Sequence, residues 1–280
     1  MKRKRILGVI FIVEVFVIAA GILLRYQHTS QERLPDLSEK KFEQFHSPVD
    51  KDKDGVDDQV DILQGALDYC NTKPKYKSKY YDSGYPDDGY GVCTDVVAFA
   101  MKAAGYDLME LMEKDIQEHP DDYGIAEPDK NIDFRRLRNL QVFFRNYVDN
   151  LTTDVFDVDN WQGGDIVIFK NHIGIVSDRR NADGVPYVIH HNDSWQKSYE
   201  EDILESRNDI VGHYRWLPEE ASVRATHLFL SDAEVKQIRE HVPLALDGVE
   251  HLIVAENESM WLFLWGRKTA SWKSPGSGIL

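Results

Sequence analysis

The stretch that most constrains the fold begins in a loop rich in glycine and tyrosine, residues 84–92, and runs directly into Cys93. Apolar residues then recur with helical spacing up to Gly105, a residue type that commonly ends helices. The pattern predicts that Cys93 lies in the first turn of a helix with one buried face. There, unpaired backbone N–H groups and the helix dipole should lower the thiol pKa and favour the thiolate.

A thiol in this position suits a cysteine nucleophile, provided that a histidine comes close. Two other interpretations stay open. Most free cysteines are small buried hydrophobes, and a disulfide between Cys70 and Cys93, the two cysteines of the chain, is compatible with export. Cys70 ends an apolar helical run, so we expect a buried, inert thiol at that position.

The N-terminus predicts a membrane anchor. Residues 2–5 are all Lys or Arg, and residues 6–24 are nearly all apolar, with Glu14 as the charged exception. At about 1.5 Å per residue, such a helix approaches the thickness of the hydrocarbon core. A basic flank stays in the cytoplasm, and no convincing cleavage site follows. We therefore expect a single-pass cell-membrane protein whose bulk is extracytoplasmic.

Composition narrows the possible partners. A chain of 280 residues that is 42% hydrophobic and 29% charged can bury a globular core. Its formal net charge of −15 argues against nucleic-acid binding, because no basic surface is available to follow a phosphate backbone.

An acidic loop at residues 50–61 has the spacing of a calcium loop. Carboxylates occupy loop positions 1, 3, 5, 9 and 12, and glycine occupies position 6. The predicted ligands are Asp50, Asp52, Asp54, the carbonyl of Val56, Asp58 and Asp61, with an aspartate at position 12 where glutamate is usual. The alternative is a solvated acidic turn that caps the following helix. Calcium here would be structural, and we expect no cofactor for catalysis.

Strands follow the helices in the second half of the chain. Apolar runs at 166–169, 172–177 and 187–192 predict an antiparallel meander that a strand near 210–216 closes, hence an α+β fold. His172 begins the second strand, and His190 and His191 end the third. Because adjacent strands bring these ends together, we expect a polar side chain to hold Nδ1 of His172. Nε2 would then accept the proton of Cys93.

Five segments (residues 85–95, 131–136, 161–167, 172–178 and 212–215) closely resemble a bacterial family called domain of unknown function 1287. The match spans about residues 50–216. That family is similar to the NlpC-type cell-wall cysteine peptidases, which have a papain-like α+β fold. The resemblance implies Cys93 as the nucleophile, His172 as the base and His190 as the third member, with His191 as the alternative.

The flanks of Cys93 depart from the pattern of those peptidases. An Asp commonly precedes their nucleophile and a Ser follows it, whereas Val92 and Thr94 occupy these positions here. The oxyanion donors and the substrate preference are therefore open. Contacts with the substrate are expected from Tyr90, Asp95 and Trp161.

We expect four parts: a membrane anchor at 1–25, a linker at 26–45, a papain-like cysteine hydrolase domain at 46–217 and a small β-α-β-β appendage at 218–280. The expected activity is hydrolysis of an amide bond in peptidoglycan stem peptides. One alternative is a non-catalytic, calcium-stabilised protein of the same fold that binds the cell wall or acts as a scaffold. Another is a transferase that uses the same thioester chemistry.

Overall fold

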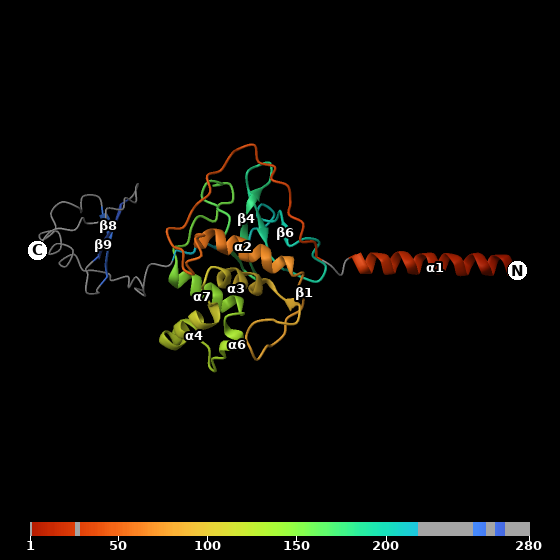
Figure 1. The fold of residues 1–280 in the computed structure, drawn as a ribbon, viewed down its shortest axis with the longest axis horizontal. Helices are drawn as coiled ribbons and strands as arrows, with labels where there is room; N and C mark the ends of the chain where they lie inside the picture. The colour runs from red at the N-terminus through yellow and green to blue at the C-terminus, as the bar shows by residue number, and fades with distance from the viewer. Residues whose placement is uncertain (1, 26–28, 218–248, 256–260, 267–280) are drawn as a thin grey trace, which may run out of the picture. The chain divides into compact units, whose positions relative to one another are not determined.

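The computed structural model describes residues 2–25, 29–217, 249–255 and 261–266 (Figure 1). The chain divides into two compact units, Met1–Pro218 and Glu219–Leu280. Helix α1 (Lys2–Arg25) occupies the stretch predicted as an anchor. Across the described residues, no helix is both long enough and apolar enough to span a bilayer. In the second unit, β8 (Val249–Ala255) pairs antiparallel with β9 (Trp261–Gly266), and the rest of the predicted appendage lies outside the described residues.

Two helices carry both cysteines and pack closely together. Helix α2 (Asp58–Asn71) is capped by the side chain of Asp57, which accepts hydrogen bonds from two N–H groups of its first turn. Helix α3 (Cys93–Ala103) begins at Cys93, as predicted. A Cβ atom added to Gly65 would lie 2.4 Å from Cβ of Ala103. The absence of a side chain at Gly65 is therefore what allows α2 and α3 to approach.

The remaining helices are short. They are α4 (Leu108–Glu118), α5 (Pro120–Tyr123), α6 (Lys130–Asp133) and α7 (Leu137–Tyr147). The sequence reads as one helical pattern from 129 to 150, but the structure divides it. Arg136 has an extended backbone with φ −94° and ψ 116° before α7 begins. In the resulting turn, Arg135 directs its guanidinium to a buried carboxylate near Cys93.

Five strands form an antiparallel sheet in the order β6-β5-β4-β3-β7. Their bounds are β3 (Ile166–Phe169), β4 (His172–Arg180), β5 (Pro186–Ile189), β6 (Glu200–Glu201) and β7 (Ile210–Tyr214). The predicted α+β class and the antiparallel meander are confirmed. Strand β6 was not predicted, because two residues are too few to show an alternating pattern. A separate pair, β1 (Lys75–Tyr76) and β2 (Tyr90–Gly91), runs parallel just before α3.

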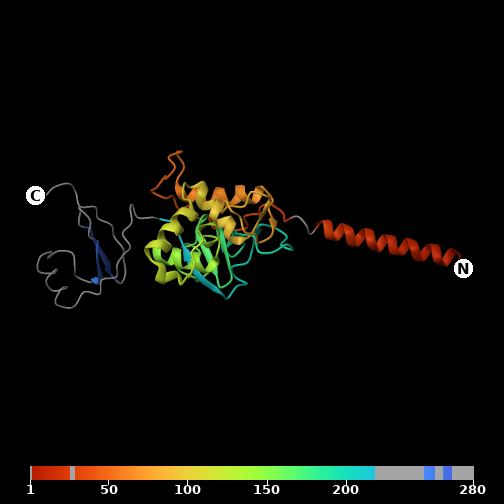
Figure 2. The same cartoon turned by 90° about the horizontal axis from the view of Figure 1, so that it is seen from below.

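Alternate residues of the sheet enter two apolar clusters. Ile173 and Ile175 of β4 pack in the cluster that contains α2 and α3, whereas Val176 belongs to a second cluster that includes Phe169 and Trp161. Successive side chains of a strand point to opposite faces, which explains the division. Helices α2 and α3 cover one face of the sheet, as the two views show (Figures 1 and 2).

The segment predicted as a linker packs against the sheet from residue 29 onward. Ser30 and Leu37 donate backbone hydrogen bonds to the carbonyls of Lys197 and Arg180, at 2.8 Å each. Arg33 also forms an ion pair with the buried Glu200 at 2.8 Å. Packing of the domain therefore does not begin at residue 46 as expected. Polar composition alone did not reveal these partners, which lie more than a hundred residues away in the chain.

Candidate functional site

The first turn of α3 is fixed by a buried ion pair. Asp95 accepts a hydrogen bond from the N–H of Val92 at 2.8 Å. Its two oxygens also accept from Nε and Nη2 of Arg135, at 2.6 and 2.9 Å. Asp95 is fully buried, so the expectation that it contacts substrate is wrong for this structure. It shapes the turn that presents Cys93 instead.

Both cysteines are free, and the disulfide alternative is therefore wrong. Cys70 is buried, as expected, and burial raises the pKa of its thiol. The half-buried thiol of Cys93 lies against the backbone N–H groups of Ile173 and Thr94, which favour the thiolate. Burial is the larger effect and raises the pKa of Cys93 to about 11. The expected lowering of this pKa is thus wrong, because desolvation outweighs the helix start.

His172 and His190 form a buried pair. Nε2 of His172 lies 2.8 Å from Nδ1 of His190, and the two rings meet edge to face. His190 is thus the histidine that orients His172, in line with the resemblance. The two ring nitrogens of His172 have the opposite roles from those expected from the sequence. Nε2 contacts His190, and Nδ1 is the nitrogen left to accept a proton. Burial lowers the pKa of His172 to about 3, so the ring is neutral at physiological pH.

His190 is held in turn by polar groups of the neighbouring strand and loop. Its Nε2 lies 3.3 Å from a carboxylate oxygen of Glu201. The amide of Gln196 donates to the carbonyl of His190 at 3.1 Å. The contact with Glu201 limits rotation of the His190 ring, and Gln196 holds the His190 backbone. Sequence reasoning missed both groups, because β6 and its loop carry no motif.

The Cys93 thiol lies beside strand β4, one residue along from His172. The thiol lies against the N–H of Ile173, which follows His172 directly. Within the described part of the chain, no hydrogen bond joins the thiol to an imidazole. Catalytic contacts often tighten only when substrate binds. The thiol therefore lies against the backbone of the strand that begins with the oriented histidine, and the described residues show no ion pair between the two side chains.

His191 is separate from this pair. It is fully buried, and neither ring nitrogen has a hydrogen-bond partner. Its ring meets those of Tyr76 and Tyr199 edge to face, at centroid distances of 5.2 Å each. The adjacent position on a strand faces the opposite side, which is why His190 contacts His172 and His191 does not.

Tyr76 lies near Cys93, and the sequence marked it only as one of several clustered tyrosines. Burial together with the nearby Cys93 and Asp193 raises the pKa of its phenol. Pairing of Tyr76 with Gly91 brings it beside the start of α3. Such a two-residue parallel contact leaves no periodic signal in the sequence, and the Tyr-rich composition of residues 76–81 was the available hint.

The other expected substrate contacts lie apart from one another. Tyr90 is half-buried, with Nζ of Lys79 3.9 Å from its ring centroid, at the rim of the segment that leads into Cys93. Trp161 is fully buried and stacks on His213 at a centroid distance of 3.7 Å. Trp161 thus belongs to the core in this structure and has no surface for a substrate.

The acidic loop adopts a compact turn. Asp50, Asp52 and Asp54 each bring a carboxylate oxygen within 4.8 Å of the others. The N–H of Gly55, at φ +97°, donates to Asp50 at 3.0 Å. Nearby carboxylates and, above all, burial raise the pKa of Asp61 to about 6. The three clustered carboxylates fit the donor chemistry of calcium, and the charges of Asp50, Asp52 and Asp54 also act on Asp61.

Asp58 does not join the acidic cluster. It is fully buried, accepts from the N–H of Lys51 at 2.7 Å and from the hydroxyl of Tyr106, and so anchors the loop to the domain. The expectation that Asp58 is a metal ligand is therefore wrong for this structure. The carbonyl role predicted for Val56 stays a prediction.

Comparisons with known proteins place the chain in a family. The family model described as "Domain of unknown function (DUF1287)" matches residues 63–216. The chain is also 36% identical over 152 residues to "Uncharacterized protein YijF" of Escherichia coli (strain K12), which covers 51% of this chain and 72% of that protein. No solved structure matches. The chain belongs to the DUF1287 family, which confirms the resemblance to that family seen in the sequence.

Proposed function

We propose that this protein is a membrane-anchored, extracytoplasmic cysteine hydrolase of the NlpC-like class that cleaves an amide bond in peptidoglycan stem peptides. The observation that carries the proposal is the oriented His172–His190 pair, 2.8 Å apart, on the strand whose next residue contacts the Cys93 thiol. Helices on one face of an antiparallel sheet, with the cysteine at a helix start and the base at a strand start, support a papain-like fold.

The proposed reaction follows from these positions. Sγ of Cys93 attacks the amide carbonyl while Nδ1 of His172 takes the thiol proton, and His190 keeps the His172 ring in place. N–H groups of the first turn of α3 stabilise the oxyanion. His172 then returns the proton to the leaving amine, which yields a thioester. Water, activated by the same ring, hydrolyses the thioester and restores the thiol.

The electrostatics favour proton transfer during the reaction over a resting ion pair. The Cys93 pKa of about 11 and the His172 pKa of about 3 leave both groups neutral before substrate binds. His172 therefore removes a proton from a neutral thiol, as the histidine of a serine hydrolase does from the serine hydroxyl. The same argument predicts that the Cys93 thiol reacts slowly with small alkylating reagents.

The alternative is a non-catalytic protein that binds the cell wall or acts as a scaffold, stabilised by calcium. The observation that favours it is the raised Cys93 pKa, together with the ordered acidic turn. In that case Cys93 is a structural thiol, and the metal stabilises the loop before α2.

The decisive experiment incubates the wild-type protein and a Cys93→Ala variant with purified peptidoglycan fragments and separates the products by chromatography and mass spectrometry. The hydrolase proposal predicts new amine and carboxyl termini with wild type and none with Cys93→Ala. Product formation that is unchanged in Cys93→Ala, or its absence in both, contradicts the proposal. A product joined to a second amine instead of water identifies a transferase.

A further inference from the structure

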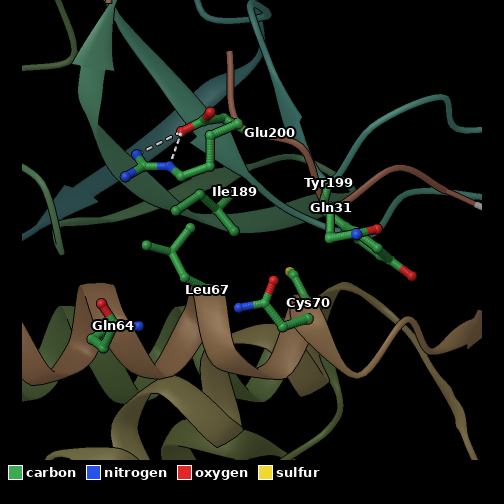
Figure 3. Close-up of a pocket in the computed structure, with 9 residues that line it drawn as sticks. Gln31, Gln64, Leu67, Cys70, Ile189, Tyr199 and Glu200 are labelled. Atoms are coloured by element: carbon green, nitrogen blue, oxygen red, sulfur yellow. Dashed lines mark hydrogen bonds and ion pairs between the residues drawn. The ribbon is translucent and has the colours of Figure 1, made fainter. Parts of the chain in front are cut away.

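A pocket of about 270 Å³ lies outside the cysteine–histidine site. It is formed where α2 faces the β5–β6 edge of the sheet, and the N-terminal segment closes a third side. In Figure 3, Leu67 and Cys70 of α2 extend toward Ile189 and Tyr199 of the sheet. The lining residues are Gln31, Arg33, Gln64, Leu67, Cys70, Asn71, Ile189, Tyr199 and Glu200.

The polar part of the lining is mainly amide. Gln31, Gln64 and Asn71 each carry a carbonyl acceptor and an NH₂ donor pair. The Gln64 amide donates to Asp68 at 2.8 Å and keeps its carbonyl available. Over the described ranges, the side-chain amides of Gln31 and Asn71 have no hydrogen-bond partner. The pocket thus offers several donors and acceptors to an incoming ligand.

The charged groups of the lining are already engaged. Glu200 accepts from Nη2 of Arg33 at 2.8 Å, from the N–H of Leu34 at 2.6 Å and from the hydroxyl of Ser177 at 2.6 Å. Arg33 additionally contacts Asp178. Because Arg33 and Glu200 pair with each other, neither charged group of the lining is left without a partner for a charged ligand. The part of the lining beside these charged groups is apolar and includes Leu67 and Ile189.

We propose that this pocket binds a neutral N-acetylated sugar. Hydroxyl and acetamido groups match the three amide side chains, and a sugar ring face with an acetyl methyl matches Leu67, Ile189 and the Tyr199 ring. The volume suits one monosaccharide. The inference deepens the proposed function and rests on it, because peptidoglycan carries N-acetylated sugars next to its stem peptides.

The pocket is linked to the catalytic side by aromatic contacts. Tyr199, which lines the pocket, packs edge to face on His191, and His191 packs in the same way on Tyr76 beside Cys93. The hydroxyl of Tyr199 also donates to the carbonyl of Pro74 at 2.7 Å. Three rings in series, Tyr199, His191 and Tyr76, would therefore separate a sugar in the pocket from the Cys93 thiol.

The test measures equilibrium binding of N-acetylglucosamine to the full chain by isothermal titration calorimetry. The Cys93→Ala protein is used so that turnover plays no part. We expect saturable binding with a dissociation constant on the order of 1 mM. Gln64→Ala and Asn71→Ala should each weaken it about tenfold, whereas Gln117→Ala, an exposed amide on α4, should leave it unchanged.

Two further ligands and one reporter complete the test. Glucosamine, which carries an ammonium group, and N-acetylalanine methylamide, a neutral peptide, should bind at least tenfold more weakly. As a reporter, N-acetylglucosamine should shift the backbone NMR resonances of Leu67 and Asn71, which line the pocket. Absence of saturable binding, equal loss in Gln117→Ala, or preference for the peptide overturns the sugar proposal. Because no hydrolysis is measured, these results are independent of whether Cys93 is catalytic.

Discussion

Nε2 of His172, the first residue of β4, lies 2.8 Å from Nδ1 of His190, the residue that follows β5. One of these nitrogens donates and the other accepts, so the tautomer of each ring determines that of the other while the contact orients His172. The proposed base role requires Nε2 of His172 to donate, which leaves its Nδ1 unprotonated. The ring of His172 also stacks on Phe169, at a centroid distance of 5.9 Å. A base held this firmly, next to the residue that contacts a free thiol, is the relationship on which the proposed chemistry depends.

Removal of the orienting histidine should lower activity without unfolding the protein. We expect His190→Ala to reduce kcat for hydrolysis of wall fragments by about 10²–10⁴-fold, because His172 loses its fixed ring orientation. His190→Asn, which keeps a hydrogen-bond acceptor, should retain more activity. His46→Ala is the matched control, since the His46 side chain is 66% exposed. Equal activity in His190→Ala and wild type would remove His190 from the mechanism.

Alkylation of Cys93 should report a neutral thiol. Only the thiolate reacts, and the Cys93 pKa is about 11. The rate with iodoacetamide should therefore rise about tenfold per pH unit from about pH 6 to pH 9. The Cys93→Ser protein gives the contribution of Cys70 to subtract. A rate that is flat across this range would reveal a preformed thiolate–imidazolium pair instead.

The sequence predicted those parts of the fold that local patterns determine. A glycine-rich loop, a run with helical spacing and Gly105 place Cys93 at the start of α3. Continuous apolar runs likewise predict β3 and β4, which are buried along most of their length. These features depend on residues close together in the chain.

The parts that sequence reasoning missed depend on distant partners. Asp95 carries no sign of its ion pair with Arg135, forty positions away. Adjacent histidines at a strand end look alike in the sequence, yet strand alternation gives them opposite faces, and only His190 meets His172. The thiol pKa follows from how deeply the helix start is buried, which a motif does not encode.

The buried ion pair beside Cys93 should be costly to break from one side. Arg135→Met leaves the carboxylate of Asp95 buried and unpaired. We expect this variant to lose about 3–5 kcal/mol of unfolding free energy in urea titrations. The double variant Asp95→Asn/Arg135→Met should be more stable than Arg135→Met alone. If the two changes simply add, the residues are not coupled as the structure shows.

His191 should make the protein sensitive to acid. Burial lowers the pKa of His191 to about 4 from a usual value of 6.5, so the unfolded chain takes up the proton first as pH falls. Its contribution to stability is thus present above pH 6.5 and is lost as the pH falls from there toward 4. At pH 5 the loss from this residue is about 2 kcal/mol.

The measurement is urea unfolding at pH 7 and pH 5. In His191→Phe, which keeps an aromatic ring between Tyr76 and Tyr199, the difference between the two pH values should shrink by about 2 kcal/mol. Phe156→Ala, which removes an exposed side chain that does not titrate, should show the same pH difference as wild type. An unchanged pH difference in His191→Phe would mean that His191 keeps a hydrogen-bonded environment in solution.

Calcium should stabilise the acidic loop. Three carboxylates within 4.8 Å repel one another without a cation, and calcium at a hundred times its dissociation constant adds about 2.7 kcal/mol. Calorimetry should therefore show a higher Tm with calcium than with a chelator, and a smaller shift with magnesium. The shift should shrink below about pH 6, where Asp61 takes up a proton.

Asp52→Asn should abolish most of the calcium-dependent shift in Tm, while Asp87→Asn, exposed and outside the loop, should retain it. An equal Tm with calcium and chelator, or an undiminished shift in Asp52→Asn, would show that the loop is a solvated turn that caps α2.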